Sequence, residues 1–458
     1  MPVSLVSIVV TAHNYADFLA QALNSALNQT YEWIEVIAVN DGSTDNTDAV
    51  LEEYKKVSNL KIIHLPGVGL ARAANYGVIA SSGDYIVRLD ADDWFDENLA
   101  VVMANYLDSN PNIGMVFSDY NEVDINGELI GTVKRARVED EVKLLDRPCL
   151  AAGAMYRRRC YDSIGGYNEQ YRYQEDYDFW INFTERFEVR NISLPLLNYR
   201  QHSLSMSNNW NGRMQARRAI KREFSEKNRG NERKKTVGII PARADYLDGM
   251  KFPLLSLGEK TLLQRAIENL SAADGIDRVI VSTEDSEIAE HARNAGAEVP
   301  ILRSPATTTP AVTANAALWE LVVWLEENAK YRSDMVAVHY PHSPFLQPCH
   351  FNEAIDSMLI YKTTAVIAVV QDLTYHWRIG ANGLEPVGYV QRVVRQDKEL
   401  VFKEAGGMYL LRWDALMEGN ASFGESVGHI ELSSSEAFRI YGSWEYEVAQ
   451  KLISCEDA

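Results

Sequence analysis

Cysteine is scarce in this sequence, with four residues among 458. They are Cys149, Cys160, Cys349 and Cys455, which lie far apart and show none of the close spacings of a metal-binding cysteine cluster. This excludes a cysteine-based zinc site. We expect reduced thiols, as in a protein of the cytosol.

Long apolar runs are also missing. No stretch reaches the roughly 18 residues that a membrane-spanning helix needs, and no signal peptide precedes the first apolar strand. We therefore expect a cytoplasmic protein without a transmembrane segment. Peripheral contact with the inner face of the membrane stays open.

Positive charge is in the minority, because 45 lysines and arginines face 64 acids and give a formal net charge of -19. A nucleic-acid partner is therefore not expected, since phosphate backbones attract basic proteins. The length exceeds what a single hydrophobic core normally serves, so we expect more than one domain.

The most informative residues that are present form an acid cluster behind an apolar strand. Residues 84–93 read Asp-Tyr-Ile-Val-Arg-Leu-Asp-Ala-Asp-Asp, so Asp90, Asp92 and Asp93 follow the strand directly. Such carboxylates repel one another unless a cation lies between them, and a hard divalent ion with oxygen ligands suits them. The alternative is a strand followed by an acidic helix start that binds no ligand.

Two further strands are expected upstream of this cluster. Residues 5–11 form an apolar run that ends at Thr11, residues 16–29 are helical in pattern, and residues 33–41 form a second run that ends in an acidic, glycine-containing turn. Strand, helix and strand at this spacing predict a parallel α/β unit, whose ligands bind at the carboxyl ends of the strands. Thr11, Asp41, Asp90 and Asp92 all fall at such ends.

This succession resembles the family 2 glycosyltransferases of the GT-A fold, over roughly residues 4–206. The resemblance implies that Thr11, Asn40 and Asp41 hold the base and ribose of a nucleotide. It also implies that the segment 69–77, with Arg72, lies along the nucleotide. Asp90 and Asp92 would hold the ribose, the diphosphate and a Mn²⁺ or Mg²⁺ ion.

The resemblance continues in residues 165–169 and 173–180, which match the acidic catalytic motif of the family. An inverting transfer needs one carboxylate on the acceptor side to take the hydroxyl proton. Asp176 is the candidate base and Asp178 the alternative. The segment 199–205 resembles the part that closes the family's site, so that His202 is a candidate contact of the metal or diphosphate, against a purely structural histidine.

A basic stretch follows at residues 207–235, which we interpret as a helix and linker. Its cations outnumber the three acids Glu223, Glu226 and Glu232. Attraction to anionic lipid or a charged glycan is one explanation, but a solvated helix in an acidic protein is the usual one.

A second alternation of strands and helices begins after the linker. Strands are expected at 236–241, 278–283, 335–339, 364–370 and 407–411, and helices at 261–273 and 286–294. This half resembles the acylneuraminate cytidylyltransferases over about residues 236–453. The stretches that carry the resemblance are 240–243, 281–285, 296–300, 341–344, 395–396 and 406–409. It implies a second nucleotide site with Arg243, Lys251, Arg395 and Gln396, and a homodimer formed through this half.

The departures from that family fall on its phosphate and metal chemistry. Asp245 and Asp248 enter the loop that should cradle a triphosphate, where acids have the wrong sign. Arg439 and Tyr441 stand where the family has paired aspartates for Mg²⁺, and neither is a hard oxygen ligand of that kind. We therefore expect a degenerate cytidylyltransferase-like domain.

The sequence thus predicts two nucleotide-binding α/β domains in tandem, at 1–206 and 236–458, joined by 207–235. The predicted function is a metal-dependent, inverting glycosyltransferase of the hexosyltransferase type. It would move a sugar from a nucleotide-sugar donor to a glycan or lipid-linked acceptor in surface polysaccharide or glycoconjugate biosynthesis. Two alternatives stay open: a bifunctional glycosyltransferase and CMP-nonulosonate synthetase, and a non-catalytic regulatory protein that binds nucleotide-sugars.

Overall fold

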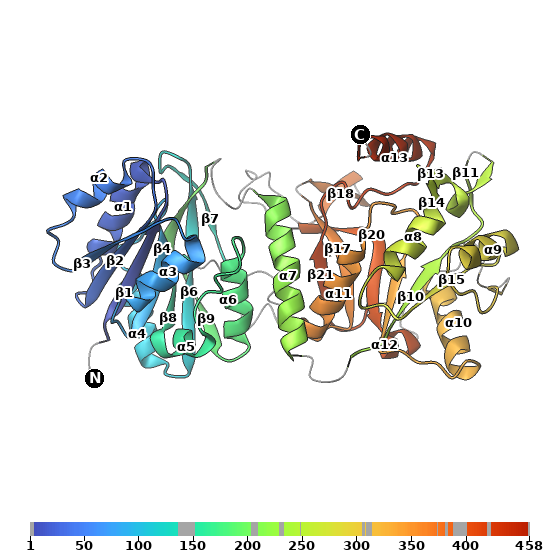
Figure 1. The fold of residues 1–458 in the computed structure, drawn as a ribbon, viewed down its shortest axis with the longest axis horizontal. Helices are drawn as coiled ribbons and strands as arrows, with labels where there is room; N and C mark the ends of the chain where they lie inside the picture. Colours follow the sequence, from blue (N-terminus) through green and yellow to red (C-terminus); the bar gives the residue numbers. More distant parts are fainter. Residues whose placement is uncertain are drawn as a thin grey trace. The chain divides into compact units, whose positions relative to one another are not determined.

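The computed structural model describes residues 4–135, 152–202, 209–228, 233–247, 249–304, 307, 314–372, 374–380, 383–387, 401–418 and 423–456. These residues form two compact units, one up to Ile220 and one from Lys221 onward (Figure 1). Both units are mixed α/β structures, so the predicted fold class is confirmed.

The first unit is built on a nine-stranded sheet with the order β3-β2-β1-β4-β8-β6-β9-β5, in which β7 pairs with β6. Its strands are β1 (Val6–Ala12), β2 (Ile34–Asp41), β3 (Leu60–Leu65), β4 (Tyr85–Asp90), β5 (Trp94–Phe95), β6 (Ile113–Val123), β7 (Leu129–Val133), β8 (Ala154–Arg157) and β9 (Glu188–Arg200). Its helices are α1 (Ala16–Leu27), α2 (Thr47–Glu53), α3 (Leu70–Ile79), α4 (Leu99–Ser109), α5 (Arg158–Ile164) and α6 (Glu175–Thr184).

The central strands of this sheet are covered on both faces, which explains their continuous apolar sequence. Helices α1, α2 and α4 pack on one face, in a core that includes Ile8 on β1 and Leu89 on β4. Helix α3 packs on the other face. Gly77 allows its close approach, because a β-carbon there would overlap with Val9 on β1.

The register of the sheet brings the predicted ligand positions to one edge. Strand β1 lies parallel between β2 and β4, with Thr11 paired to Asp90 and Ala12 paired to Asn40. The ends of three strands that are far apart in the sequence therefore lie side by side. This arrangement places the acid cluster next to the turn at residues 40–42.

Helix α7 (Trp210–Asn228) contains the division between the two units, at Ile220 and Lys221. The expectation of a solvated basic helix is wrong in part, because Arg217 and Lys221 are buried. Lys221 donates to Glu353 over 3.1 Å and to Ser357 over 3.1 Å within the second unit. A buried ammonium needs such partners, since an unpaired charge in the interior is costly. The domain boundaries at 206 and 236 stay predictions.

The second unit has a six-stranded sheet with the order β15-β10-β16-β20-β17-β21. Its strands are β10 (Thr236–Pro241), β15 (Arg278–Ser282), β16 (Met335–His339), β17 (Ala365–Asp372), β20 (Val401–Arg412) and β21 (Val427–Glu431). Three two-stranded sheets are added by β11 (Tyr246–Leu247) with β12 (Met250–Lys251), β13 (Ser256–Leu257) with β14 (Lys260–Thr261), and β18 (His376–Gly380) with β19 (Gly383–Val387).

Helices cover both faces of this second sheet. The helices of the unit are α8 (Leu262–Ser271), α9 (Ser286–Asn294), α10 (Ala314–Glu327), α11 (Pro348–Tyr361), α12 (Trp413–Met417) and α13 (Ser443–Glu456). Helices α8, α9 and α11 share one core with the sheet, while α10 and α12 share the other. The strand expected at 407–411 is the end of the much longer β20, which runs antiparallel to β16 and β17.

Among the helices in these described ranges, none is both long enough and apolar enough to cross a bilayer.

Candidate active site

The first group of predicted residues lies where β1, β2 and β4 end. Thr11 donates from Oγ1 to Oδ1 of Asp90 over 3.2 Å, so these two side chains meet as the register requires. Asp41 is buried, and its two carboxylate oxygens accept the backbone N–H groups of Val68 and Gly69 at 2.6 and 2.8 Å. Asp41 therefore fixes the segment that leads into α3.

Asn40 shapes the neighbouring turn. Its Oδ1 accepts the backbone N–H of Ser43 at 3.1 Å, and its Nδ2 donates to Asp48 over 2.6 Å. The side chain of Asn40 is buried, and these two contacts stabilise the conformation of the turn. The contacts of Asn40 and Asp41 do not test their predicted role toward a base or ribose, which stays a prediction.

Arg72 lies on α3 and reaches the motif that follows α5. Its Nε is 2.6 Å from Oε2 of Glu169, and both side chains are partly exposed. Asn75, one turn further along α3, donates to the carbonyl of Tyr167 and to Glu169 at 2.9 and 3.1 Å. Helix α3 is thereby tied to the segment 167–169, which precedes the acidic motif of α6.

The side chains of the acid cluster after β4 contact different partners. Asp92 lies 2.9 Å from Nε2 of His202, so His202 does reach the cluster. Burial and the nearby carboxylate of Asp90 raise the pKa of Asp92 above its usual range. Asp93 is fully buried, and it accepts the backbone N–H of Arg200 at 2.9 Å. Burial, followed by the charges of Asp92 and Asp90, also raises the pKa of Asp93.

A divalent metal would find part of its ligand set in this cluster. Among the residues that the structure describes, no three His, Cys, Asp or Glu side chains converge as a complete set. Asp90 and Asp92 nevertheless supply two carboxylates whose mutual repulsion a cation would relieve. This repulsion adds to burial, the larger cause, in raising the pKa of Asp92. The two carboxylates fit a hard cation that takes its other ligands from a diphosphate and water.

The acidic motif opens helix α6, and its three acids differ in accessibility. Glu175 and Asp178 are buried, whereas Asp176 is partly exposed. Asp176 accepts the backbone N–H of Tyr177 at 2.8 Å through one oxygen. Asp178 contacts Asn182, one turn further along the helix. The accessible carboxylate at the start of α6 is therefore that of Asp176.

Sequence reasoning missed the residue that connects the two motifs, Arg88 on β4. Its guanidinium is buried and lies 3.1 Å from Asp90 and 3.1 Å from Glu175. It also lies over the ring of Tyr167, with 5.3 Å to the centroid. An arginine inside an otherwise apolar strand was the available signal, because a buried cation has to find acidic partners.

Two of the predicted residues of the second unit, Arg243 and Lys251, are described by the structure, and both pair with acids. Nε of Arg243 lies 2.9 Å from Asp245, so the added aspartate neutralises it. Lys251 lies 2.6 Å from Asp285 and 2.7 Å from Glu287, and the hydrogen bonds to these acids raise its pKa. Asp285 also caps α9 by accepting from two backbone N–H groups. The predicted positions Arg395, Gln396 and Asp248 lie outside the described residues.

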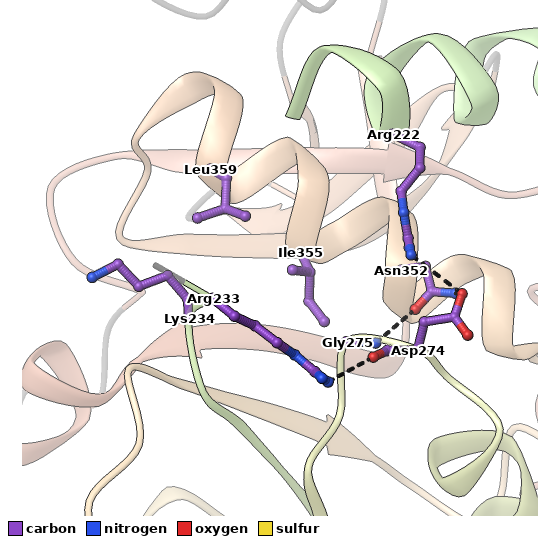
Figure 2. A pocket seen from close by; sticks show the side chains of 8 residues that line it. All are labelled: Arg222, Arg233, Lys234, Asp274, Gly275, Asn352, Ile355 and Leu359. Atoms are coloured by element: carbon purple, nitrogen blue, oxygen red, sulfur yellow. Dashed lines mark hydrogen bonds and ion pairs between the residues drawn. The ribbon is translucent and has the colours of Figure 1, made fainter. Parts of the chain in front are cut away.

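A pocket of about 220 Å³ lies in the second unit, and neither Arg243 nor Lys251 is among the residues that line it. Figure 2 shows this pocket. It is lined by Arg222, Arg233, Lys234, Asp274, Gly275, Asn352, Ile355 and Leu359. Arg233 and Lys234 precede β10 and Asp274 precedes β15, so the pocket is at the amino ends of the strands. Each cation has an acidic partner: Asp274 for Arg222, Asp277 for Arg233 and Asp334 for Lys234. This pocket is no candidate for an anion site.

Comparisons with known proteins agree with this division of the chain. The family model of glycosyl transferase family 2 matches residues 7–165, and that of the cytidylyltransferases matches residues 237–418. An uncharacterized glycosyltransferase of Haemophilus influenzae is 32% identical over 235 residues, which are 48% of this chain and 72% of that protein. The hyaluronan synthase of Pasteurella multocida is 30% identical over 192 residues, 42% of this chain but only 20% of the synthase.

Among solved structures, this chain is similar to residues 1–349 of S. aureus TarS in complex with UDP-GlcNAc. The sequence identity is 20% and the TM-score is 0.42, and the match covers 48% of this chain and 66% of the TarS chain. The match to the Haemophilus protein extends over most of the length of that protein. The chain therefore belongs to glycosyl transferase family 2 and is a glycosyltransferase, with a cytidylyltransferase-like domain in its C-terminal half.

Proposed function

We propose that the first unit transfers a hexosyl group from a nucleotide-sugar to a glycan or lipid-linked acceptor, with inversion and with the help of a divalent metal. One observation carries the proposal. Arg88 pairs with Asp90 at the end of β4 and with Glu175 at the start of α6, which supports a single site with its donor side at the acid cluster and its acceptor side at α6.

In the proposed reaction the residues of the chain have separate tasks. Asp90 and Asp92 would hold the metal, which when bound supplies positive charge to the departing diphosphate. Asp176 would accept the proton of the attacking acceptor hydroxyl, because it is the accessible acid of its motif. Glu175 is too buried to be the base and instead pairs with Arg88. The nucleotide would be positioned by Thr11, Asn40, Asp41 and Arg72.

Calorimetry with UDP and GDP, with and without Mn²⁺, tests the donor part of this proposal. We expect metal-dependent binding of one of the two nucleotides that Asp92→Ala abolishes. Asp162→Ala is a matched control, because Asp162 is an exposed acid on α5. Binding that is indifferent to both Mn²⁺ and Asp92→Ala would refute the metal-dependent site.

We further propose that the second unit does not make a CMP-sugar at a useful rate. Asp245 neutralises Arg243, and Asp285 with Glu287 neutralises Lys251, so the cations expected to meet a triphosphate are already paired. The test is pyrophosphate release from CTP, Mg²⁺ and a set of nonulosonic acids. Release above background that Arg243→Gln removes would establish the bifunctional alternative instead.

A further inference from the structure

A groove in the first unit lies between helix α1 and strand β5, and none of the residues assigned to the transfer reaction lines it. Its volume is about 470 Å³, within the range of about 300–1,000 Å³ that is usual for sites of small ligands. The lining of this α1–β5 groove includes Gln21, Asn24, Ser25, Asn28, Trp94 and Glu97.

The two walls of the groove are joined by hydrogen bonds. Oγ of Ser25 on α1 accepts the backbone N–H of Phe95 at 3.1 Å, and Nε2 of Gln29 donates to the carbonyl of Asp96 over 2.9 Å. Positions 21, 24, 25 and 28 share one face of α1, because they are three or four residues apart. Helix α1 starts after the carboxyl end of β1, and the chain then returns to the start of β2. The groove therefore leads away from the sheet edge that carries the acid cluster.

Amide side chains in the groove have unused hydrogen-bond donors. Oδ1 of Asn24 accepts from the hydroxyl of Tyr54 at 3.0 Å, and Oε1 of Gln21 accepts from Nη2 of Arg200 at 2.6 Å. Each bond occupies the carbonyl end of the amide, and the NH₂ end has no acceptor among the described residues. The side chain of Asn28 is exposed at the end of α1 and likewise has no partner in the described part of the chain. Such amides can bond to the hydroxyl groups of a ligand.

Trp94 adds an aromatic ring whose position is fixed. The guanidinium of Arg200 lies 4.8 Å from the centroid of this ring, and it donates to the carbonyls of Asp92 and Ile125 at 2.9 and 2.7 Å. The ring is partly exposed. One guanidinium thus holds both the indole of Trp94 and the amide of Gln21, so these groups are in place before a ligand binds.

The charge of the groove disfavours an anionic ligand. Glu97 is exposed, and no lysine, arginine or histidine is among the described residues that line the groove. A nucleotide or an acidic sugar would meet a carboxylate of its own sign. A neutral sugar instead has hydroxyl groups for the amides and the carboxylate, and its ring has an apolar C–H face that packs on an indole.

We propose that the α1–β5 groove binds a neutral oligosaccharide through its three amide side chains and the ring of Trp94. This binding needs neither the metal nor the nucleotide of the transfer reaction. In the transfer proposed for the first unit, the groove gives a distant part of a glycan acceptor a second contact. That role rests on the proposed function, whereas the binding itself does not.

Calorimetry of the full chain in EDTA, without nucleotide, tests the proposal with chitotetraose, cellotetraose and maltotetraose as separate probes. We expect saturable binding of at least one tetrasaccharide, weakened about tenfold by Trp94→Leu and about threefold by Asn28→Ala. Asn112→Ala is the matched control, because Asn112 is an exposed amide outside the groove. It should leave the affinity unchanged. Circular dichroism compares the folding of the three variants, and Asn28→Ala decides should Trp94→Leu disturb the fold near Arg200.

Three results would overturn the proposal. The first is an absence of saturable binding for all three tetrasaccharides at millimolar concentration. The second is binding that Asn28→Ala and Trp94→Leu leave unchanged, because the ligand would then lie elsewhere, as at the acceptor side near Asp176. The third is equally tight binding of myo-inositol, which has hydroxyl groups but is not a sugar chain. None of these results bears on the metal-dependent nucleotide binding that tests the transfer reaction, so the two proposals fail separately.

Discussion

Arg88 and Glu175 form a buried ion pair in which Nη1 of the guanidinium lies 3.1 Å from Oε1 of the carboxylate. The two side chains are only 5% and 7% exposed. Arg88 precedes Asp90 by two positions on β4, and Glu175 is the neighbour of Asp176 on α6. Burial raises the pKa of Glu175 to about 7, and the charge of Arg88 opposes that rise. The pair thus connects the strand that carries the acid cluster to the helix that carries the proposed base.

The first prediction is that this pair is needed for stability as a unit. Arg88→Met should lower the free energy of unfolding by about 3–5 kcal/mol, because it leaves a carboxylate buried without this partner. Adding Glu175→Gln should recover much of the loss, since the remaining group is then neutral. Urea unfolding of both single variants and the double variant measures the coupling.

A surface ion pair in the same unit is the matched control for Arg88. Arg72 and Glu169 are partly exposed, so Arg72→Met should cost no more than about 1 kcal/mol. Equal losses of unfolding free energy in Arg88→Met and Arg72→Met would contradict the prediction that the buried ion pair matters more than the exposed one. So would a double variant that is no more stable than Arg88→Met.

The second prediction concerns the proposed base. Asp176→Asn keeps the shape of the side chain and removes its basicity, which should lower the transfer rate by roughly 10²–10⁴. Donor affinity should persist, because Asp176 lies on the acceptor side in the proposed reaction. Transfer is measured as release of the nucleoside diphosphate, and affinity by calorimetry.

Asp178→Asn is the comparison for Asp176. Asp178 is buried beside Asn182, so its replacement should affect folding more than the chemical step. Normal turnover by Asp176→Asn together with loss of turnover in Asp178→Asn would mean that Asp178 is the base.

The sequence predicted correctly that residues at the ends of neighbouring strands meet in this site. Thr11 and Asp90 are 79 positions apart, yet parallel strands bring their carboxyl ends to one edge, and the two side chains do meet. The pairing of Arg88 with Glu175 could not be found in this way, because it depends on where β4 and α6 pack against each other. The same holds for Asp93 with Arg200, a contact between an acid after β4 and the end of β9.

In the second unit β10, β15 and β16 were predicted from their apolar runs, but β21 and the full length of β20 were not. Its first half, from Val401, carries exposed and charged residues and pairs with β17 beyond an irregularity at Ile367 and Val369. A strand segment of this kind has no periodic apolar signal. The approach of Arg439 to Gly406 and of Ser343 to Gly407 could not be predicted either, because it depends on the backbone shape at these two glycines.

The third prediction is a homodimer that forms through the hairpin of β18 and β19. Pairing of Trp377 with Pro386 and of Ile379 with Leu384 gives this hairpin one apolar face. Ile379 is 90% exposed and Leu384 is 69% exposed, which is unusual for so large a group of apolar side chains. A two-stranded hairpin is marginal by itself, so we expect a second copy to cover this face.

Light scattering after gel filtration measures the mass of the full chain and of the variant Ile379→Asp. The wild-type chain should have twice the mass of its sequence, and Ile379→Asp should shift the mass toward one copy. Arg378→Ala is the control, because Arg378 is adjacent to Ile379 in the strand and therefore points to the opposite face of the hairpin. A wild-type monomer at micromolar concentration, or a dimer that Ile379→Asp leaves intact, would refute the prediction.

The last prediction concerns His339, which is buried at the end of β16 with neither ring nitrogen hydrogen-bonded to a described residue. Burial and, after it, the nearby His342 lower its pKa from 6.5 to about 3. The unfolded chain therefore binds a proton between these two pH values that the folded chain does not. The stability that neutral His339 contributes to the fold is fully present above pH 6.5 and is lost as the pH falls toward 3. Between pH 8 and pH 5 the loss should be about 2 kcal/mol from this group.

His339→Leu removes this titration without removing a hydrogen bond to a described residue, so the variant should lose less stability than the wild type between pH 8 and pH 5. Urea unfolding at the two pH values gives the difference directly. His291→Gln changes an exposed histidine on α9 and should keep the pH dependence of the wild type. His342, whose pKa is also lowered, remains in every variant and cancels in the comparison. Identical pH dependence in His339→Leu and the wild type would show that His339 is not held neutral by burial, because a buried neutral histidine has to weaken the fold in acid.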